Sequence, residues 1–382
     1  MTIDQMAQSK LKQLDNQNLR RSLYETGRRE SCLVIRDGQE LVSFCCNDYL
    51  GLSQHPNVKK AASDAILKYG VGAGASRLVT GNHPLYGELE RTLAKIKGTE
   101  AALVFGSGYL ANLSIPPVIV GSGDLIVADE LSHASMRAGI QASSADSIYF
   151  RHNDTSDCYA ILKQERDNYK NCLIMTEGVF SMDGDLAPLV ELCELAEEFG
   201  SWIMTDDAHG FGVMGQGRGS AAEIGVLEKI PLQMGTLSKA VGVYGGFICA
   251  SRAVIDLILN RGRSVIYATG LPPSAVAAAT ASLKIIETDQ ELVNLPIRHA
   301  RQFTKQLGLP HAESPIIPII TETSEKALAA SAQLMKEGFL VTAIRPPTVP
   351  EGTARLRFTF SAQHNEDDID TLAAVVSRIG LA

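Results

Sequence analysis

The residue of this sequence best suited to covalent chemistry is Lys239, which lies in the segment Gly-Thr-Leu-Ser-Lys-Ala at residues 235–240. Apolar runs at residues 230–234 and 247–250 flank this segment, and we interpret them as strands. Lysine is almost never fully buried without a partner or a task. A desolvated amine loses its proton more readily, and the neutral amine can attack a carbonyl carbon. The alternative interpretation is an ordinary lysine in an exposed turn between two strands.

Polar residues also follow other expected strands, which alternate with helices along the chain. They are His133 after the strand at 125–128, Ser181 after the strand at 171–176, and Asp206 and His209 after the strand at 202–205. This spacing is typical of right-handed crossover units in a parallel sheet. Open α/β sheets bind their ligands at the carboxyl ends of their strands. The pattern therefore predicts that these side chains share one site.

A glycine-rich segment, Gly-Ser-Gly-Tyr at residues 106–109, separates an expected strand at 101–105 from a helix that starts near Leu110. Glycines at this position let backbone N–H groups approach an anion, and the helix dipole favours negative charge there. The segment is thus a candidate phosphate site at Gly108 and Tyr109. A tight packing turn would use glycine as well.

The totals exclude several classes of protein. The chain has 382 residues, a net charge of −8 and a polar N-terminus without the apolar stretch of a signal peptide. A chain with this net negative charge does not have the clustered lysines and arginines of a nucleic-acid-binding surface. No apolar run approaches the ~18 residues of a membrane span. The seven cysteines form no C-x-x-C pair, so we expect reduced core residues and a cytoplasmic protein.

The domain organisation changes near residue 289, where helical runs begin to alternate with short strands expected at 316–320, 340–344 and 355–361. We predict an N-terminal arm at 1–44, a large α/β domain with a mostly parallel sheet at 45–288, and a smaller α+β domain at 289–382. The arm is expected to be a polar helix to about residue 27. In the small domain, Arg355 and Arg357 alternate with apolar residues and share one face of a strand, which could also be a solvated face.

Taken together, these residues suit a ligand that has an aldehyde, a phosphate and a ring nitrogen. Lys239 would bond to the aldehyde, residues 106–109 would hold the phosphate, and His133 could stack on the ring. Asp206 would keep a pyridine nitrogen protonated, so that the ring acts as an electron sink. The ligand with these three features is pyridoxal 5′-phosphate (PLP).

Three motifs resemble those of the α-oxoamine synthases, which are fold-type I PLP-dependent transferases of the aspartate aminotransferase-like fold. They are Thr-Glu-Gly-Val-Phe-Ser-Met-Asp-Gly-Asp at 176–185, Asp-Asp-Ala-His-Gly at 206–210 and Thr-Leu-Ser-Lys-Ala at 236–240. The resemblance runs in the family's order from residue 47 to Arg357. It implies an α/β enzyme that binds PLP and works as a homodimer with the active site at the subunit interface.

The resemblance also implies roles for particular residues. Lys239 would be the Schiff-base lysine and the acid/base, with Asp206, His209 and His133 as the other catalytic residues. The cofactor contacts would be Gly108, Tyr109, His133, Ser181, Asp206, His209, Thr236 and Lys239. The substrate contacts would be Arg21, Asn47, His133, Thr348 and Arg357, of which Arg357 grips the amino-acid carboxylate. Arg20 is an equally good candidate for the role of Arg21.

The segment Ala-Ile-Arg-Pro-Pro-Thr-Val-Pro at residues 343–350 is similar to one branch of this family. Members of that branch condense L-alanine with pimeloyl-CoA or a pimeloyl carrier protein in biotin biosynthesis. The glycine acetyltransferases and aminolevulinate synthases differ at this segment. Residues 70–76 and 82–83 depart from the family pattern, which leaves the preferred acyl chain open.

Four other interpretations remain. Another synthase of the family would use glycine or serine with a different acyl-CoA. A non-catalytic binding subunit would typically have lost the lysine that is present here. A nicotinamide-dependent dehydrogenase would depend only on the glycine-rich segment at 70–76, which lacks a third glycine at dinucleotide spacing. A zinc hydrolase would have to use Asp129, His133 and His209, which do not have a metal-ligand spacing, so we expect no metal.

Overall fold

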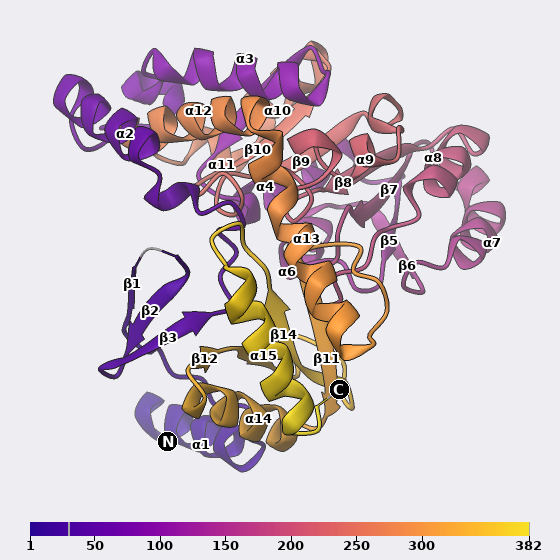
Figure 1. The fold of residues 1–382 in the computed structure, drawn as a ribbon. Helices are drawn as coiled ribbons and strands as arrows, with labels where there is room; N and C mark the ends of the chain where they lie inside the picture. Colours follow the sequence, from indigo (N-terminus) through magenta and orange to yellow (C-terminus); the bar gives the residue numbers. More distant parts are fainter. Residues whose placement is uncertain (30, 382) are drawn as a thin grey trace. The chain divides into compact units, whose positions relative to one another are not determined.

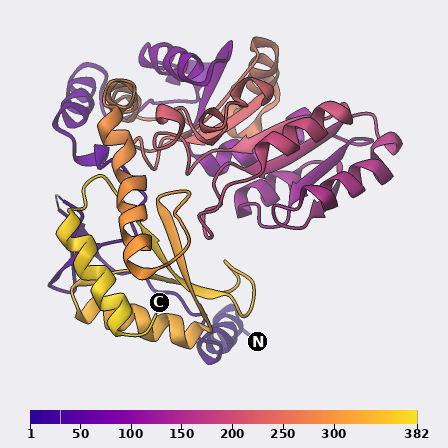
Figure 2. The same ribbon diagram turned by 45° about the vertical axis from the view of Figure 1, so that its right-hand side comes forward.

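The computed structural model describes residues 1–29 and 31–381, and they form two compact units (Figures 1 and 2). Unit 1 consists of Met1–Cys46, Met182–Gly184 and Pro296–Ala382. Unit 2 consists of Asn47–Ser181 and Asp185–Leu295. Each unit has its own sheet structure and its own hydrophobic core, so each is described by itself.

A seven-stranded sheet in the order β4-β10-β9-β8-β7-β5-β6 forms the centre of unit 2. The strands are β4 (Ala101–Phe105), β5 (Leu125–Asp129), β6 (Asp146–Phe150), β7 (Cys172–Glu177), β8 (Trp202–Asp206), β9 (Leu232–Thr236) and β10 (Gly246–Ala250). Only β10 runs antiparallel to its neighbours β4 and β9. The predicted mostly parallel α/β sheet is therefore confirmed. Most of these strands are buried on both faces, which is why they read as continuous apolar runs.

Helices cover both faces of this sheet. They are α2 (Pro56–Tyr69), α3 (Leu85–Lys97), α4 (Gly108–Ser114), α5 (Pro116–Ile119), α6 (Ala134–Ala142), α7 (Thr155–Glu165), α8 (Leu189–Glu198), α9 (Ser220–Glu223), α10 (Arg252–Arg261), α11 (Arg263–Ile266) and α12 (Pro273–Thr288). Strand β5 shows how the faces are divided. Its Ile126 and Ala128 join the core that contains α4 and α6, and its Leu125 and Val127 join the core under α7 and α8.

Unit 1 contains two small sheets and four helical segments. The four-stranded sheet β1-β2-β3-β12 uses Thr26–Arg28, Leu33–Arg36, Gln39–Ser43 and Phe339–Leu340, and the three-stranded sheet β11-β14-β13 uses Ile316–Glu322, Ala354–Thr359 and Thr342–Ile344. The helices are α1 (Ile3–Asn16), α14 (Ser324–Lys336), α15 (Glu366–Arg378) and the C-terminal part of α13 (Gln290–Leu307). Helices α13, α14 and α15 bury one face each in a shared core, in which Phe303, Phe358 and Phe360 are in ring contact. Figures 1 and 2 show α15, in yellow, beside α14.

Two details of unit 1 correct the sequence-based expectations. The N-terminal helix ends at Asn16 instead of near residue 27, because Asn18 adopts a left-handed conformation (φ 55°) just after the helix and stops it. The expected strand at 340–344 is two strands on either side of Val341. The first pairs with β3, and the second pairs with β14 in the other sheet.

Candidate active site

Lys239 lies in the turn that joins the antiparallel neighbours β9 and β10, and its side chain is half-buried. Its Nζ is 2.8 Å from Nε2 of His209, and Nδ1 of that histidine is 2.6 Å from the hydroxyl of Tyr49. His209 and Tyr49 are buried. The turn closes on Gly242 (φ 74°), where a Cβ would come within 2.4 Å of the backbone nitrogen of Ser53. A lysine, an imidazole and a phenol thus form a line of groups that can share protons.

Asp206 ends β8 and is buried. Its Oδ1 accepts a hydrogen bond from the backbone N–H of Ala208 (3.0 Å), and its Oδ2 accepts one from the side-chain amide of Asn112 on α4 (2.6 Å). These two bonds leave little freedom for the carboxylate to rotate. A carboxylate fixed in this way can hold a cationic ring nitrogen in one position.

His133 is connected to Asp206 by a chain of hydrogen bonds. Nδ1 of His133 is 2.6 Å from the Ser135 hydroxyl, and it also accepts from the Ser135 backbone N–H. The Ser135 hydroxyl in turn accepts from the amide of Asn112. His133 is exposed, yet the protein packed around the ring lowers its pKa by desolvation, and the nearby Lys239 lowers it further against the opposing effect of Asp206. A neutral ring with Nδ1 as acceptor fits these contacts.

Glu177 ends β7 and pairs directly with Asp206 across the sheet. Its carboxyl accepts hydrogen bonds from the backbone N–H groups of His133 (2.8 Å) and Ser181. Burial raises the pKa of Glu177 well above its ordinary value, and the negative charge of Asp206 raises it further. The two carboxyl groups therefore differ: one is aimed by Asn112, and the other tends to stay neutral and holds the two loops that carry His133 and Ser181.

The predicted phosphate contacts lie together at the start of α4. The hydroxyl of Ser107 caps this helix by accepting from the N–H of Leu110 (3.2 Å). A Cβ on Gly108 would lie 3.5 Å from the hydroxyl of Thr236, and a Cβ on Gly246 would come within 2.5 Å of the Gly108 nitrogen. Strand β10 can approach this turn so closely only because residue 246 is a glycine.

The residues present in unit 2 fit PLP. Its aldehyde needs an amine, its pyridine nitrogen a carboxylate, its phosphate N–H and hydroxyl donors, and its ring a flat partner. Lys239, Asp206, the turn at Gly108 with Thr236, and His133 supply these groups in that order. Electrostatic coupling of His133 and Glu177 to both Asp206 and Lys239 indicates that these four side chains lie close together.

The sequence also predicts contacts with cofactor or substrate for three more residues of unit 2, Ser181, Tyr109 and Asn47. Ser181 is buried and follows β7, while Tyr109, the second residue of α4, is exposed. Asn47 is half-buried, and its carbonyl accepts the N–H of Tyr49 (2.9 Å). Asn47 is therefore two residues from the phenol that contacts His209.

Arg357 lies in unit 1 on β14, the middle strand of the three-stranded sheet. It is buried, and its Nη1 donates to the hydroxyl of Thr359 (3.1 Å). Arg355 is buried as well, and its guanidinium donates to the carbonyl of Met182 (3.2 Å) and contacts the carboxylate of Asp183. The alternative of a solvated strand face is therefore wrong, because the side chains of Arg355 and Arg357 are both buried.

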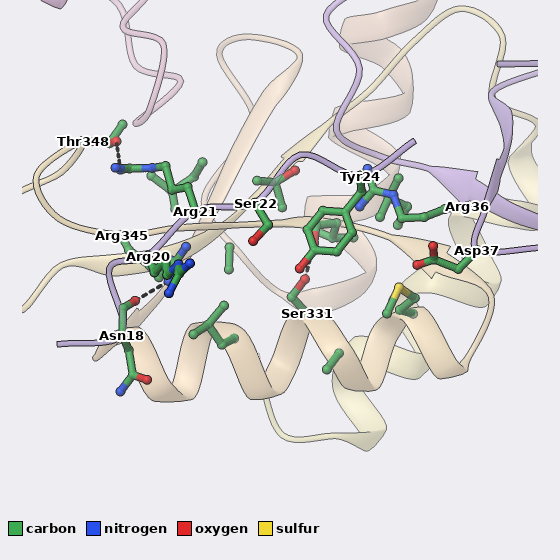
Figure 3. Close-up of a pocket in the computed structure, with 18 of the residues that line it drawn as sticks. Asn18, Arg20, Arg21, Ser22, Tyr24, Arg36, Asp37, Ser331, Arg345 and Thr348 are labelled. Atoms are coloured by element: carbon green, nitrogen blue, oxygen red, sulfur yellow. Dashed lines mark hydrogen bonds between the residues drawn. The ribbon is translucent and has the colours of Figure 1, made fainter. Parts of the chain in front are cut away.

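Unit 1 also contains a cavity of about 710 Å³ between the segment after α1, strand β2, helix α14 and strand β13 (Figure 3). Arg20, Arg21, Arg36 and Arg345 all line it. Arg21 donates to the hydroxyl of Thr348 (3.3 Å), whereas Arg20 forms an ion pair with Asp15 (2.7 Å). The structure thus brings Arg21, and not Arg20, into contact with Thr348, which is another of the predicted substrate residues.

Three residues to which the sequence assigns no role contact the site residues of unit 2: Asn112, Tyr49 and Glu177. Asn112 was not considered, because nothing in the local sequence of α4 links it to Asp206, which is 94 residues away. Tyr49 lies in the part of the chain that carries the family resemblance, which starts at residue 47, and Glu177 lies in the motif at 176–185. The sequence therefore indicates their positions but not their contacts. Among the described residues, no cluster of His, Cys, Asp and Glu suits a metal ion. No helix of the described chain is long and apolar enough to cross a membrane.

Comparison with known proteins first shows the family to which the chain belongs. The model of the family described as "Aminotransferase class I and II" matches residues 39–376. The chain therefore belongs to this family. The predicted fold-type I architecture is confirmed by the same comparison and by solved structures.

Individual relatives indicate which enzymes of this family the chain resembles. The 8-amino-7-oxononanoate synthase of Beijerinckia indica is 55% identical over 376 residues, which cover 98% of this chain and 97% of that protein. The one of Methylocella silvestris is 58% identical over 346 residues, covering 91% and 99%. A serine palmitoyltransferase from S. paucimobilis with a bound PLP–myriocin aldimine has a TM-score of 0.92 at 29% identity, covering 99% of this chain and 98% of that chain. The 8-amino-7-oxononanoate synthase from Francisella tularensis has a TM-score of 0.75 at 28% identity, covering 89% and 97%.

Proposed function

We propose that this protein is a PLP-dependent C-acyltransferase that makes 8-amino-7-oxononanoate from L-alanine and a pimeloyl thioester, a step of biotin biosynthesis. In this reaction the Cα of alanine forms a bond to the thioester carbonyl carbon. The thiolate of the carrier and the carboxylate carbon, as CO2, leave. The observation that carries the proposal is the group Lys239–His209–Tyr49 beside the Asp206–Asn112 pair, in a chain 52–58% identical to relatives of that name.

When bound, PLP supplies an electron sink for the negative charge that develops at the substrate Cα. Lys239 would hold the cofactor aldehyde and, once released, move the Cα proton. Its contact with His209, backed by Tyr49, gives that proton a place to go. Asp206 would hold the ring nitrogen, His133 would stack on the ring, and Ser181 would contact the ring edge.

In unit 1, we propose that Arg357 binds the α-carboxylate of alanine through paired hydrogen bonds. A pimeloyl chain ends in a second carboxylate, and the arginine-lined cavity offers donors for it. Arg21 and Thr348, which already contact one another, are the residues we assign to the acyl substrate, and Asn47 of unit 2 to the same substrate.

Further parts of the proposal concern the whole protein. We propose that unit 2 corresponds to the large cofactor domain and that most of unit 1 corresponds to the small domain with the N-terminal arm. We propose a cytoplasmic homodimer with the active site at the subunit interface, as the family resemblance implies. The acyl carrier, CoA or a protein, is to be identified by assay.

A second candidate is a synthase that uses serine or glycine. The close structural match to serine palmitoyltransferases favours it specifically. The higher sequence identity to relatives named 8-amino-7-oxononanoate synthase favours alanine.

The first test is the visible absorption spectrum of the purified protein with PLP, titrated in parallel with L-alanine, glycine and L-serine. We expect a cofactor band that shifts at far lower concentration with L-alanine than with the other two. A best response to glycine or serine would keep the chemistry and change the product. No cofactor band in the wild type, together with an identical spectrum for Lys239→Ala, would overturn the proposal.

A further inference from the structure

His152 lies in the loop between β6 and α7 of unit 2, outside the residues assigned above, and both of its ring nitrogens face carboxylates. Its Nδ1 is 3.1 Å from Oδ1 and 3.2 Å from Oδ2 of Asp129, and its Nε2 is 2.8 Å from Oδ2 of Asp185. The side chain of Asp129 is fully buried, that of His152 is 21% exposed, and that of Asp185 is 35% exposed. One ring thus connects a buried and a partly exposed carboxylate.

This geometry requires a charged ring. A neutral imidazole has one N–H donor and one acceptor nitrogen, so it could donate to only one of the two carboxylates. The imidazolium donates to both. The pKa of His152 agrees: although burial of the ring lowers it, hydrogen bonds and charge attraction from Asp129 and Asp185 outweigh burial and raise it to about 10. Three more acidic residues face this loop: Glu130 accepts the backbone N–H of His152 (3.1 Å), and Asp154 and Asp157 form ion pairs with Arg151.

The first carboxylate belongs to the loop that leads to His133. Asp129 is the last residue of β5, and besides His152 it accepts the backbone N–H groups of Leu131 (2.8 Å) and Asn153 (2.9 Å). The path of the chain from Asp129 to His133 therefore depends on the orientation of one carboxylate, and His152 is the side chain that holds it.

The second carboxylate belongs to the loop that carries Ser181. Asp185 closes this loop, since its carbonyl accepts the N–H of Phe180 (3.0 Å). The amide of Asn153 also donates to Asp185 (2.9 Å), and the His152 ring packs edge-on against Phe180 with the ring centres 4.4 Å apart. Both loops are thus fastened to the same short stretch after β6.

We propose that His152 is a positioning residue whose protonated ring sets the spacing between the His133 loop and the Ser181 loop. Glu177 joins the same two loops from inside by accepting the backbone N–H groups of His133 and Ser181. His152 joins them from outside. The inference rests on the proposed function, because the two loops matter through the pyridine ring that His133 and Ser181 are assigned to contact.

The test compares His152→Phe, His152→Gln and a matched control, Arg151→Ala. Arg151 is the preceding residue, and its exposed side chain forms ion pairs with Asp154 and Asp157. We measure the affinity of the cofactor-free proteins for PLP and the visible circular dichroism of the bound cofactor, which reports how the ring is held. We expect at least tenfold weaker PLP binding and an altered dichroic band for the Phe variant, a partial effect for the Gln variant, and wild-type values for the control.

A milder variant keeps the inference testable where His152→Phe does not fold. Asp185→Asn removes the partly exposed carboxylate and leaves the pair with Asp129 intact. We expect its PLP affinity to fall more steeply than that of the wild type as the pH rises, because one carboxylate holds the proton of His152 less firmly than two. PLP binding and dichroism equal to wild type in a folded His152→Phe variant, or a pH-independent Asp185→Asn variant, would overturn the inference. Failure of the wild type itself to bind PLP would overturn the proposed function instead.

Discussion

Two buried carboxyl groups, those of Asp206 and Glu177, lie opposite one another at the ends of neighbouring strands. Two like charges this close cannot both be ionised without a cost, unless one of them has a charged or hydrogen-bonded partner. Asp206 has the amide of Asn112, whereas Glu177 accepts backbone N–H groups and has a pKa that stays raised although the charge of Lys239 lowers it. At the scale of single residues, the surroundings therefore suit Asp206 to bind a cation and Glu177 to hold the two loops that carry His133 and Ser181.

The first prediction concerns the protonation of Glu177. The raised pKa means that its neutral form is favoured by folding; this contribution is fully present below the ordinary value of 4.5 and is lost as the pH rises through the raised value. Glu177→Gln keeps the acceptor for the His133 N–H without an ionisable group. We expect the cofactor-free variant to be more stable than wild type at pH 8, with a smaller difference at pH 5. Urea unfolding at both pH values checks this, with the exposed Glu198→Gln as a control that shows no such trend.

The second prediction concerns Asn112, whose amide donates to both Asp206 and Ser135. A hydrogen bond to a charged group contributes about 1.5–3 kcal/mol, so we expect Asn112→Leu to weaken PLP binding roughly 10- to 100-fold. Titration of cofactor-free protein with PLP measures the change. Asn168→Leu, at an exposed position of the same unit, should bind as wild type does. Equal affinities for both variants would remove Asn112 from the site.

At the scale of elements, two close approaches hold the site residues in place. Strand β10 passes so close to the first residue of α4 that only glycine fits at 246, and helix α3 ends at Lys97, whose buried amine pairs with Asp207 (3.1 Å). Asp207 also accepts the hydroxyl of Ser220 (2.8 Å) and immediately follows Asp206. Strand β10, helix α3 and the turn after β8 are thus held in place by these close contacts.

The third prediction tests the approach of β10 to α4. In Gly246→Ala, the added methyl group would lie within 2.5 Å of the Gly108 nitrogen, so the turn before α4 must move. We expect at least tenfold weaker PLP binding and a loss of stability of about 1–3 kcal/mol, measured by PLP titration and urea unfolding. Gly121→Ala is the control, because its Cβ would meet only the Ser144 hydroxyl at an ordinary 3.6 Å. Wild-type PLP affinity in Gly246→Ala would contradict the role assigned to this turn.

The fourth prediction tests the buried ion pair. Lys97→Met leaves the charge of Asp207 buried without its cation, which typically costs about 3–5 kcal/mol. Lys95→Met on the same helix breaks an exposed pair with Glu287 and should cost less than about 1 kcal/mol. Urea unfolding of both variants at pH 7 compares them directly. Similar losses in the two would mean that the Lys97–Asp207 pair does not hold α3 to the turn after β8.

At the scale of the whole molecule, each unit contains a histidine with a shifted pKa, and the two shifts have opposite directions. In unit 1, His364 is buried against Phe44 with the rings stacked 4.0 Å apart, its Nε2 donates to the carbonyl of Ser43 (3.0 Å), and burial lowers its pKa to about 4. In unit 2, the two carboxylates around His152 raise its pKa to about 10. The stability from His364 is present above pH 6.5 and is lost as the pH falls toward 4. That from His152 is present below pH 6.5 and is lost as the pH rises toward 10.

The fifth prediction follows from these signs. We expect hydrogen exchange followed by mass spectrometry to show opening first in unit 1 at pH 5 and first in unit 2 at pH 9. The shift of His364 from 6.5 to about 4 corresponds to about 3 kcal/mol across the acid range. His364→Gln should flatten the acid response of unit 1, and His311→Gln, at an exposed position of the same unit, should leave it unchanged. An acid response that starts in unit 2 would contradict the assignment.

The sequence alone determined six of the seven strands of the sheet in unit 2, all except β6, and the motifs around Lys239, Asp206 and His209. These features are local: a buried strand reads as an apolar run, and the residues that follow it are adjacent in the chain. The same motifs carried the family resemblance, which the comparisons confirm. The roles of the individual residues stay predictions that the experiments above test.

Only the tertiary structure decided which distant residues meet. Tyr49 reaches His209 across 160 residues, and the amide of Asn112 reaches Asp206 across 94. It also divided one apolar run between two sheets at Val341 and buried Arg355 and Arg357 in the middle of a sheet. The physical reason is the same each time: pairing of strands and side-chain contacts between distant segments depend on how the chain packs, and no local pattern records them.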